Sequence, residues 1–442
     1  MQRSYLVESL FLSLLVLVSC GRKTIEPVEI SGNNSGSEKI EPENPQFQVP
    51  PSEGDFNPKP ITGKPRQYQT PTRRLHEHEY PQFIDDLDFE LLDTVINRQL
   101  SRFAQKNLNG TIQLGEDVYP LKQVGHSLEL LKRLAVATTT CLGETPSQSV
   151  RDYCYERFND EIRREFNVYI PDLKPGDIRY GEEKPVFFTG YFTPTIPVKK
   201  RHDNHSPHAI YKRPLDAKYA AATRKQIDFE GLLKGRGLEL GFGPDLFELY
   251  LLHVEGGGKL QFNDSEKQTD VYISFNGTNK KKWQFISKYM LEKGLINNPS
   301  IAAQRAFLRK NPHRAEEIYS TCPSYVFFKK TDHPPLGNDS VPLTDRRSIA
   351  TDSELYRFKG LPTFIKTRRL SEDLQSLSSL ETAKKLNYVD YSRFYLDQDT
   401  GGAIKGKARV DLYFGESYYA EEASSVQQER GDMYFLIMKS EH

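Results

Sequence analysis

The sequence predicts a mainly β protein, in which an N-terminal helical segment precedes a closed β-barrel. After Pro171 the apolar residues occur in short runs that glycine and proline interrupt, and few stretches keep helical spacing. Many short strands bounded by turn residues are typical of a barrel. The chain also has 24 Tyr and 25 Phe against 4 Met. Abundant tyrosine suits a β-rich protein with a polar, stacking surface, such as one that handles sugars.

The helical segment is expected to contain three helices. Apolar residues keep helical spacing from Phe83 to Phe103, Leu128 and Ala135 belong to a second such pattern, and residues 150–166 repeat an apolar side chain every fourth position. This spacing places the apolar side chains on one face of a helix. None of the three stretches carries a group of reactive side chains, so we expect them to serve in packing.

The strands of the barrel are expected after the helical segment. Strand patterns occupy residues 186–194, 271–277, 324–328, 348–352, 361–365 and 433–437. The second of these ends in Asn276-Gly277, a dipeptide that favours a tight hairpin turn. An apolar run at 246–254 belongs to the same region, whereas helical patterns are found there at 283–291 and 301–308. The region is therefore predicted to consist mostly of strands joined by turns.

Length and charge limit the classes of protein to consider. A chain of 442 residues is long enough for two or three domains with sizeable cores. The 60 basic and 60 acidic residues cancel, which argues against nucleic-acid binding, because that role usually needs a basic excess. The mean hydropathy of -0.63 is low for a compact domain, so part of the chain is expected to be unpacked.

The N-terminus accounts for the unpacked part. An apolar run from Leu10 to Val18 is too short to span a membrane but has the length of a signal-peptide core. It leads directly into Cys20, in a context that resembles the bacterial lipobox, whose cysteine becomes lipidated. The following Gly21, in place of Asp, resembles outer-membrane sorting. The alternative is an ordinary secretory signal with a chance cysteine.

We therefore expect residues 1–20 to be a lipoprotein signal peptide with Cys20 as the lipidated residue. Residues 21–72 are rich in Pro, Ser, Glu and Asn and show no apolar periodicity, which is typical of a disordered tether. Together they predict a protein that is lipid-anchored in the cell envelope, at the periplasmic face of the outer membrane.

The remaining cysteines fit an exported protein. Cys141 and Cys154 are close in sequence and are able to close a short loop in an oxidising compartment, although the sequence leaves this bond open. Cys322 has no evident partner, and a buried, small apolar side chain is favoured there over a nucleophile.

Familiar metal and cofactor motifs do not account for the chemistry. His202, His205 and His208 lie three residues apart in a polar, proline-containing loop, where a solvated loop is favoured over a metal site. The glycines at 235–241 do not match the dinucleotide fingerprint, and the segment 255–259 lacks the spacing of a P-loop. We expect no metal and no nucleotide cofactor.

Carboxylates remain as the candidate chemistry. Asp399 and Asp411 flank the pair Gly401-Gly402 in a strand-like region, where aspartate and paired glycine are unusual. One interpretation is a turn aspartate and a surface aspartate in a hairpin. The other is an acid that crowding with Asp411 and Asp352 keeps protonated above the ordinary Asp pKa of about 3.9. A retained proton is what cleavage of a glycosidic bond requires.

Four blocks of sequence resemble motifs of the membrane-bound lytic murein transglycosylase A family. They are Phe188-Thr189-Gly190-Tyr191-Phe192-Thr193-Pro194, then Ile210-Tyr211-Lys212-Arg213-Pro214, then residues 323–328 with 341–350, and last the block Asp399 to Gly406 with 409–415. Their order and approximate spacing agree with the family from about residue 184 onward, whereas residues 83–166 match no motif of it.

The resemblance implies a fold of two domains. A double-psi β-barrel, built from segments before and after a smaller inserted β-domain, would border a sugar-binding groove. We expect the helical segment and the first part of the barrel at 73–190, the insert at 191–320 and the second part of the barrel at 321–442.

The resemblance also implies the activity, which is cleavage of the MurNAc-GlcNAc β-1,4 bond of peptidoglycan with formation of 1,6-anhydro-MurNAc ends. Asp399 would be the single catalytic acid and base, with Asp352 and Asp411 as supporting carboxylates. Lys405 is expected to serve Asp411, Asp352 or the ligand. The residues expected to contact substrate are Thr189, Gly190, Tyr191, Gly401, Gly402 and Lys405.

The insert departs from the family pattern in its glycine-rich segment. Residues 254–258 read Val-Glu-Gly-Gly-Gly where the family has Val-Gln-Gly-Ser-Gly, and Phe275 stands where the family has Tyr. Glu255 therefore places a carboxyl where an amide is usual. The insert is expected to bind its glycan differently or less tightly.

Two rival functions remain. One is a water-using peptidoglycan hydrolase in which Asp399 and Asp411 act as acid and base. The other is a non-catalytic cell-wall-binding lipoprotein, which the altered glycine-rich segment favours.

Overall fold

The computed structural model describes residues 65–174, 185–262, 268–299, 301–372, 388–402 and 404–440. The predicted signal peptide, Cys20 and most of the predicted tether lie outside the described residues. Strand β1 (Arg66–Thr70) falls within the range predicted for the tether and pairs in parallel with β3 (Gly110–Leu114). Regular structure therefore begins before residue 73. In the described part of the chain, no helix is both long and apolar enough to cross a membrane.

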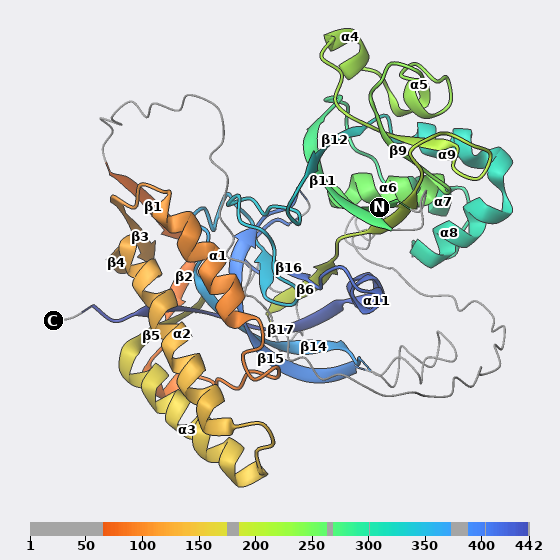
Figure 1. The fold of residues 1–442 in the computed structure, drawn as a ribbon. Helices are drawn as coiled ribbons and strands as arrows, with labels where there is room; N and C mark the ends of the chain where they lie inside the picture. Colours follow the sequence, from red (N-terminus) through yellow and green to blue (C-terminus); the bar gives the residue numbers. More distant parts are fainter. Residues whose placement is uncertain are drawn as a thin grey trace, which may run out of the picture.

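Three helices pack on one side of the first lobe of the molecule (Figure 1). They are α1 (Leu92–Ala104), α2 (Lys122–Leu142) and α3 (Gln148–Glu165). Between them β4 (Asp117–Pro120) pairs with β3, and after them β5 (Phe166–Pro171) pairs with β2 (Thr72–Arg74). The second and third predicted helices are confirmed. The first is shorter than predicted, because α1 begins nine residues after Phe83.

Asp85 explains why the first helix starts late. Its carboxylate accepts hydrogen bonds from the amides of Leu87 and Phe89 at 3.1 and 3.2 Å, and it binds the guanidinium of Arg347. The turn also has a positive φ at Phe89, which a helix does not allow. Phe83 and Phe89 instead pack on the barrel, so the apolar spacing that begins at Phe83 reflects burial and not a helix.

The first lobe is a closed barrel made from both ends of the folded chain. Its strands run in the order β14-β15-β13-β16-β6-β17, and pairing of β14 with β17 closes the ring. Their bounds are β6 Val186–Tyr191, β13 Ser348–Ala350, β14 Pro362–Leu370, β15 Tyr388–Asp399, β16 Arg409–Tyr413 and β17 Gln428–Met438. The pairs β13–β15 and β6–β16 are parallel. Helix α11 (Tyr418–Val426), which has no counterpart among the predicted helices, lies between β16 and β17.

The second lobe is inserted between β6 and β13 (Figure 1). One sheet has the order β12-β11-β10-β7, and β8 pairs with β9 in another. Single bridges join Lys199 to Phe242 and Lys212 to Phe328, which links the two sheets into a ring around an apolar core. The strands are β7 Thr195–Val198, β8 His208–Tyr211, β9 Glu239–Gly243, β10 Gly257–Phe262, β11 Thr269–Thr278 and β12 Val326–Thr331.

Helices cover this inserted lobe. Their bounds are α4 Ala217–Ala220, α5 Arg224–Asp228, α6 Leu246–Glu255, α7 Ile286–Glu292, α8 Ile301–Lys310 and α9 Ala315–Ser320. The predicted helices at 283–291 and 301–308 are confirmed as α7 and α8. The apolar run at 246–254, placed among the strands, is helix α6, which Asp245 caps by accepting a hydrogen bond from the Phe247 amide at 2.8 Å.

The predicted hairpin turn at Asn276-Gly277 is wrong. Strand β11 continues through this dipeptide to Thr278, and the pairing with β12 shifts there, as in a β-bulge. Gly277 has a φ of 95°, and a Cβ on it would lie 2.5 Å from Nη1 of Arg213. The glycine thus serves a bulge against the side chain of another segment, which local sequence does not reveal.

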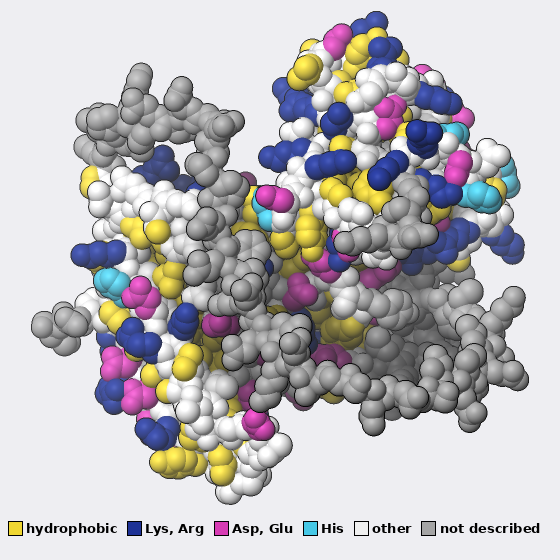
Figure 2. Space-filling model, viewed as in Figure 1, with side chains coloured by type: hydrophobic (Ala, Val, Ile, Leu, Met, Phe, Trp, Pro, Cys, Tyr) yellow, Lys and Arg dark blue, Asp and Glu magenta, His cyan; other side chains and the backbone are white. Residues whose placement is uncertain are grey.

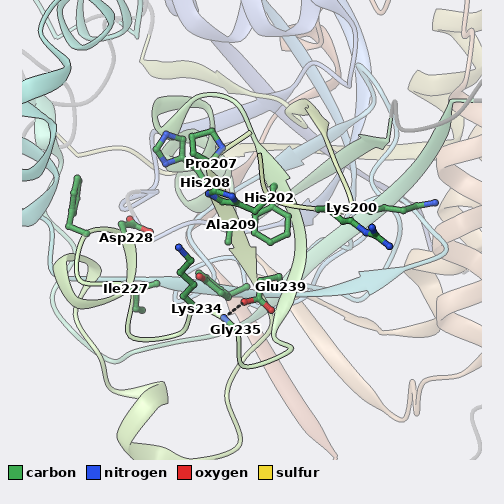
Figure 3. Close-up of a pocket in the computed structure, with 15 residues that line it drawn as sticks. Lys200, His202, Pro207, His208, Ala209, Ile227, Asp228, Lys234, Gly235 and Glu239 are labelled. Atoms are coloured by element: carbon green, nitrogen blue, oxygen red, sulfur yellow. Dashed lines mark hydrogen bonds between the residues drawn. The ribbon is translucent and has the colours of Figure 1, made fainter. Parts of the chain in front are cut away.

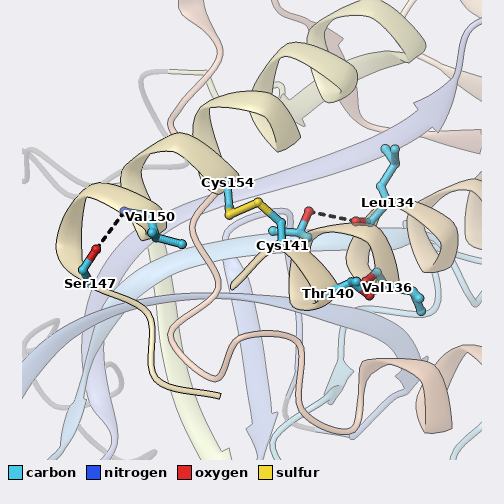
Figure 4. Close-up of a disulfide and its surroundings, with 8 residues drawn as sticks. Leu134, Val136, Thr140, Cys141, Ser147, Val150 and Cys154 are labelled. Carbon is cyan, nitrogen blue, oxygen red and sulfur yellow. Dashed lines mark hydrogen bonds between the residues drawn. A yellow bond between two sulfur atoms is a disulfide. The ribbon is translucent and has the colours of Figure 1, made fainter. Parts of the chain in front are cut away.

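The disulfide bond that the sequence analysis left undecided is present. Cys141 at the end of α2 and Cys154 in α3 make a disulfide that ties the two helices together (Figure 4). Cys322 is free and fully buried, as predicted.

Candidate active site

Asp399 is the last residue of β15 and lies beside a break in the strand pairing. Ile349 of β13 pairs with Asp397, and the next residue, Ala350, pairs with Asp399, so Gln398 is the extra residue of a bulge. The amide group of Gln398 is buried and held by hydrogen bonds to Ser348 and Gln99. Bulges re-aim side chains at strand ends. This one gives Asp399 a fixed direction.

Two donors face the half-buried carboxyl of Asp399. The hydroxyl of Tyr191 donates to Oδ2 at 3.0 Å, and the amide of Asn338 donates to Oδ1 at 2.9 Å. Burial raises the pKa of Asp399 above the ordinary value, although these two donors and the amide of Thr400 oppose the shift. The carboxyl therefore retains its proton more readily than a solvated aspartate, while its ionised form still has partners.

A buried ion pair involves the residue two positions before the acid in β15. Asp397 binds Nζ of Lys359 at 2.9 Å and accepts a hydrogen bond from Thr351 at 2.8 Å. Burial raises the pKa of Asp397 to about 6, against the opposing charge of Lys359. The charge of Asp399 adds to this shift, so the two carboxyls are coupled. The sequence analysis did not single out Asp397 or Lys359.

Asp411 lies on β16, which β13 separates from β15, and it is next to Thr189 of β6 in the parallel register. Burial raises its pKa to about 6, Arg409 at 3.3 Å opposes the shift, and the charge of Asp399 adds to it. Asp411 shares a face with Tyr413, as predicted, and the rings of Tyr413 and Tyr191 are 5.2 Å apart. The charges of Asp399 and Asp411 are therefore coupled.

Asp352 does not take part in that crowding. Its carboxylate accepts hydrogen bonds from the amides of Gly406 at 2.8 Å and Glu354 at 3.0 Å, and Lys405 lies 3.6 Å away. Burial acts to raise the pKa of Asp352, but these partners hold it below the ordinary value. Lys405 pairs with Asp352 and Glu354, one of the three roles expected for it. Asp352 thus stays ionised and fixes the loop between Asp399 and β16.

The glycines predicted to contact substrate differ in their surroundings. Gly190 points away from the acid, because a Cβ on it would lie 2.6 Å from the ring of Phe414, so it serves packing. Gly401 follows the acid and faces Ile404, whereas a Cβ on Gly402 would meet no described atom within 4 Å. Gly402 therefore leaves the entrance beside Asp399 open to an approaching molecule.

A loop from the barrel supplies a partner that the sequence analysis missed. The Asn338 amide belongs to this loop, and helix α1 holds it: Gln99 donates to Asp339 at 2.7 Å, and Arg102 donates to the Asp339 carbonyl at 2.8 Å. Lys106 forms an ion pair with the same carboxylate. The helical segment thus holds the loop whose Asn338 amide donates to the acid. Its apolar periodicity alone does not reveal this role.

Glu255, which the sequence analysis noted only as a departure, also joins the site. It ends helix α6 of the inserted lobe and is half-buried. Burial raises the pKa of Glu255 to about 8, and the charge of Asp411 adds to this shift. The carboxyls of Asp399, Asp411 and Glu255 thus follow one another across the border of the two lobes.

A separate pocket of about 560 Å³ lies within the inserted lobe (Figure 3). Its lining includes Lys200, His202, His208, Asp228 and Lys234, and none of the residues predicted for the active site. The described residues contain no cluster of three or more side chains suited to a metal ion. Figure 2 shows Lys and Arg side chains gathered over this lobe. We place the chemistry at the carboxyls, because they combine burial, coupling and fixed donors.

These features define a barrel protein with an inserted β-lobe and a candidate acid at the border of the two. A family model described as "MltA specific insert domain" matches residues 187–329, and one described as "3D domain" matches residues 347–437. Together these spans cover just over half of the chain. The chain belongs to the family of membrane-bound lytic murein transglycosylase A.

Curated relatives carry that name. The protein from Vibrio cholerae is 29% identical over 273 residues, which are 59% of this chain and 69% of the relative. The protein from Escherichia coli K12 is 27% identical over 256 residues, which are 57% of this chain and 64% of the relative. The alignments thus span about two thirds of the length of these relatives.

Solved structures share the fold. A membrane-bound lytic murein transglycosylase from Agrobacterium tumefaciens matches with a TM-score of 0.58 and 21% identity, over 83% of this chain and 97% of its own. Escherichia coli MltA with bound chitohexaose also gives 0.58, at 18% identity, over 84% of this chain and 95% of its own. The predicted fold, a barrel with a smaller inserted β-domain, is confirmed.

Proposed function

We propose that this protein, a lytic transglycosylase of peptidoglycan, cleaves the bond between N-acetylmuramic acid and N-acetylglucosamine with Asp399 as its only acid and base. The observation that carries the proposal is the environment of this carboxyl. Burial raises its pKa, which keeps the proton available, while Tyr191 and the Asn338 amide are in place to stabilise the carboxylate. A residue that must serve first as acid and then as base needs both properties.

The reaction proceeds in two proton transfers. Protonated Asp399 donates its proton to the glycosidic oxygen as the bond from that oxygen to C1 of the muramic residue breaks. The resulting carboxylate takes the proton from the muramic O6 hydroxyl, whose oxygen attacks C1 and closes a 1,6-anhydro ring. The substrate supplies the nucleophile, so neither water nor a second catalytic carboxylate is needed. The charge of Asp399 raises the pKa values of Asp411 and Asp397, so these three carboxyls are electrostatically coupled.

Anchoring belongs to the same proposal. The relatives are named membrane-bound. Cys20, directly after the apolar run, would carry the lipid, and the segment after it would tether the enzyme at the periplasmic face of the outer membrane. Palmitate labelling of the full-length chain tests this, with Cys20→Ala as the variant that should lose the label.

Matched variants test the role of Asp399. We expect Asp399→Asn to lower kcat on purified sacculi by about 10²- to 10⁴-fold, the usual contribution of general acid-base catalysis. Asp411→Asn should keep roughly a tenth or more of the activity, because Asp411 transfers no proton in the proposed reaction. Full activity of Asp399→Asn would contradict the proposal. Equal losses in the two variants would favour a hydrolase that uses both carboxyls.

A further inference from the structure

Glu255 occupies a fixed position at the border of the two lobes. It is the last residue of α6, and Gly256 ends the helix with a φ of 74° and an amide that donates to the Leu252 carbonyl at 3.0 Å. A Cβ on Gly258 would lie 2.3 Å from the Leu252 side chain and 2.8 Å from the Pro194 carbonyl oxygen. The turn from helix to strand therefore has little room to shift, which holds the Glu255 backbone in place.

The groups that face Glu255 do not favour a negative charge. Asp411 of β16 is the described ionisable group whose charge acts on it, and the amide of Phe192 provides one opposing donor. Lys259, on the strand that follows, is already paired with Glu416 at 2.9 Å, and Arg409 is paired with Asp411. Among the carboxyls of Asp399, Asp411 and Glu255, only that of Asp411 has a guanidinium within salt-bridge distance. Burial and this arrangement raise the pKa of Glu255 to about 8.

Unsatisfied polar atoms near this border point to a missing ligand. Within the described residues, Thr189 Oγ1 and Arg409 Nη1 are buried and have no hydrogen-bond partner. A buried polar atom without a partner is costly, and such atoms are usually paired in the functional state. The two atoms belong to the adjacent strands β6 and β16, and β16 also carries Asp411.

A protonated glutamate resembles glutamine in shape and in having one donor and one acceptor. The corresponding position of the family motif is an amide, so the neutral form of Glu255 preserves its hydrogen bonding, whereas the ionised form loses the donor. We propose that Glu255 is a glycan-binding residue whose carboxyl donates a hydrogen bond to a carbonyl or hydroxyl of an N-acetylated sugar at the border of the two lobes. The neutral form makes this bond, and ionisation releases the glycan. This inference rests on the proposed function, because it takes the sugar to be part of the same substrate.

Glycan affinity, measured separately from turnover, tests the inference. The Asp399→Asn variant serves as the parent, because it is expected to bind without cleaving, and chitohexaose is the probe in calorimetric titrations. We expect the affinity of the parent to fall by about tenfold between roughly pH 6.5 and pH 9, because ionisation above a pKa near 8 removes the bound form at up to tenfold per pH unit. Adding Glu255→Gln should keep the affinity constant within about twofold over the same range, since the amide cannot ionise.

The variant pair separates binding from folding. At the acidic end we expect Glu255→Gln to match the parent within about threefold, because both side chains present a donor, while Glu255→Ala should bind about tenfold more weakly. Equal loss of affinity at high pH in the parent and in the Gln variant would overturn the inference, as would absence of chitohexaose binding at every pH. Wild-type enzyme that yields no anhydro products, together with the expected pH-dependent binding, would instead overturn the proposed function alone.

Discussion

At the scale of single residues, the opposition between burial and hydrogen bonding decides what Asp399 can do. Burial alone would leave a neutral acid that is a poor base, and exposure alone would leave an ionised group with no proton to give. The hydroxyl of Tyr191 limits the rise in pKa that burial causes, because it donates to Oδ2 of Asp399 at 3.0 Å. The neighbouring Tyr413 does not bind this carboxyl. Its hydroxyl instead shares a hydrogen bond of 2.7 Å with the hydroxyl of Thr193.

Tyr191→Phe should therefore raise the pKa of Asp399 further. A hydrogen bond to a charged group is worth about 1.5–3 kcal/mol, so the alkaline limb of the kcat profile should move up by roughly one to two pH units. We expect kcat at neutral pH to fall about tenfold, because the carboxylate formed in the first step is less stable. Initial rates on sacculi from pH 5 to 10 measure both effects. Tyr413→Phe is the control, and an identical shift in that variant would contradict the role given to Tyr191.

At the scale of elements, helix α1 supports the acid through a relay of polar contacts. Gln99 accepts from Gln398 at 2.9 Å, in the bulge beside Asp399, and donates to Asp339, next to the Asn338 amide. The helix thus orients both the strand that carries the acid and the loop that stabilises it. This gives the segment before the barrel a function beyond packing.

Gln99→Ala should weaken both supports. Leaving buried partners unsatisfied costs about 1–3 kcal/mol of unfolding free energy. We also expect kcat to fall with little change in KM, because the acid and the Asn338 amide lose their alignment while the sugar contacts remain. Gln105→Ala, an exposed position of the same helix end, is the control and should change stability by less than about 0.5 kcal/mol. Equal kcat in the two variants would argue against the relay.

The disulfide between α2 and α3 should stabilise the helical layer without touching the acid. It closes a loop with a sequence separation of 13, which corresponds to about 3 kcal/mol of stabilisation by loop-closure entropy. Replacing Cys141 and Cys154 by alanine should lower the urea midpoint accordingly and leave kcat within about twofold. Unchanged stability would show that the bond is not formed in the isolated protein.

At the scale of the whole molecule, one buried ion pair joins the chain before the insert to the chain after it. Asp85 and Arg347 are both fully buried and share two hydrogen bonds of 2.6 and 3.0 Å. Burial acts to raise the pKa of Asp85, but Arg347 holds it below its ordinary value. Stability from this pair is therefore present above the unfolded pKa and is lost as the pH falls through the folded one.

Asp85→Asn should unfold with a free energy lower by about 3–5 kcal/mol at neutral pH, because it leaves the Arg347 charge buried and unpaired. The difference from wild type should shrink below about pH 4, where the Asp85 carboxyl of the unfolded wild-type chain begins to be protonated while that of the folded chain is still ionised. Urea titrations at neutral and acid pH measure this. A difference that stays constant with pH would mean that the pair contributes no charge-dependent stability.

The sequence was sufficient for the features that local pattern and motif determine. The periodicities of α2 and α3, the strand patterns around Asp399 and the family motifs all led to correct elements and to the barrel with its insert. Two of the errors share a physical cause, which is contact with distant segments. Asp85 and its buried arginine end a helical pattern early, and Arg213 turns an Asn-Gly hairpin signal at Gly277 into a bulge.

The candidate site shows the same division. The sequence singled out Asp399 and Asp411 in a strand-like region, and Tyr191 in another strand pattern. Asp352 proved to be paired with amides and Lys405, because the chain folds back on itself there in a way that spacing does not encode. Glu255 appeared only as an unusual residue, because its relation to Asp411 exists only across the border of the two lobes.

The central claim is that the sugar's own hydroxyl, and not water, is the nucleophile that follows protonation by Asp399. Digestion of purified sacculi in ¹⁸O-labelled water, with mass analysis of the released muropeptides, tests this most directly. The account predicts products that each lack one water relative to the hydrolysed form and carry no ¹⁸O at C1, with release abolished in Asp399→Asn. Reducing ends that carry ¹⁸O would contradict it and would identify a hydrolase.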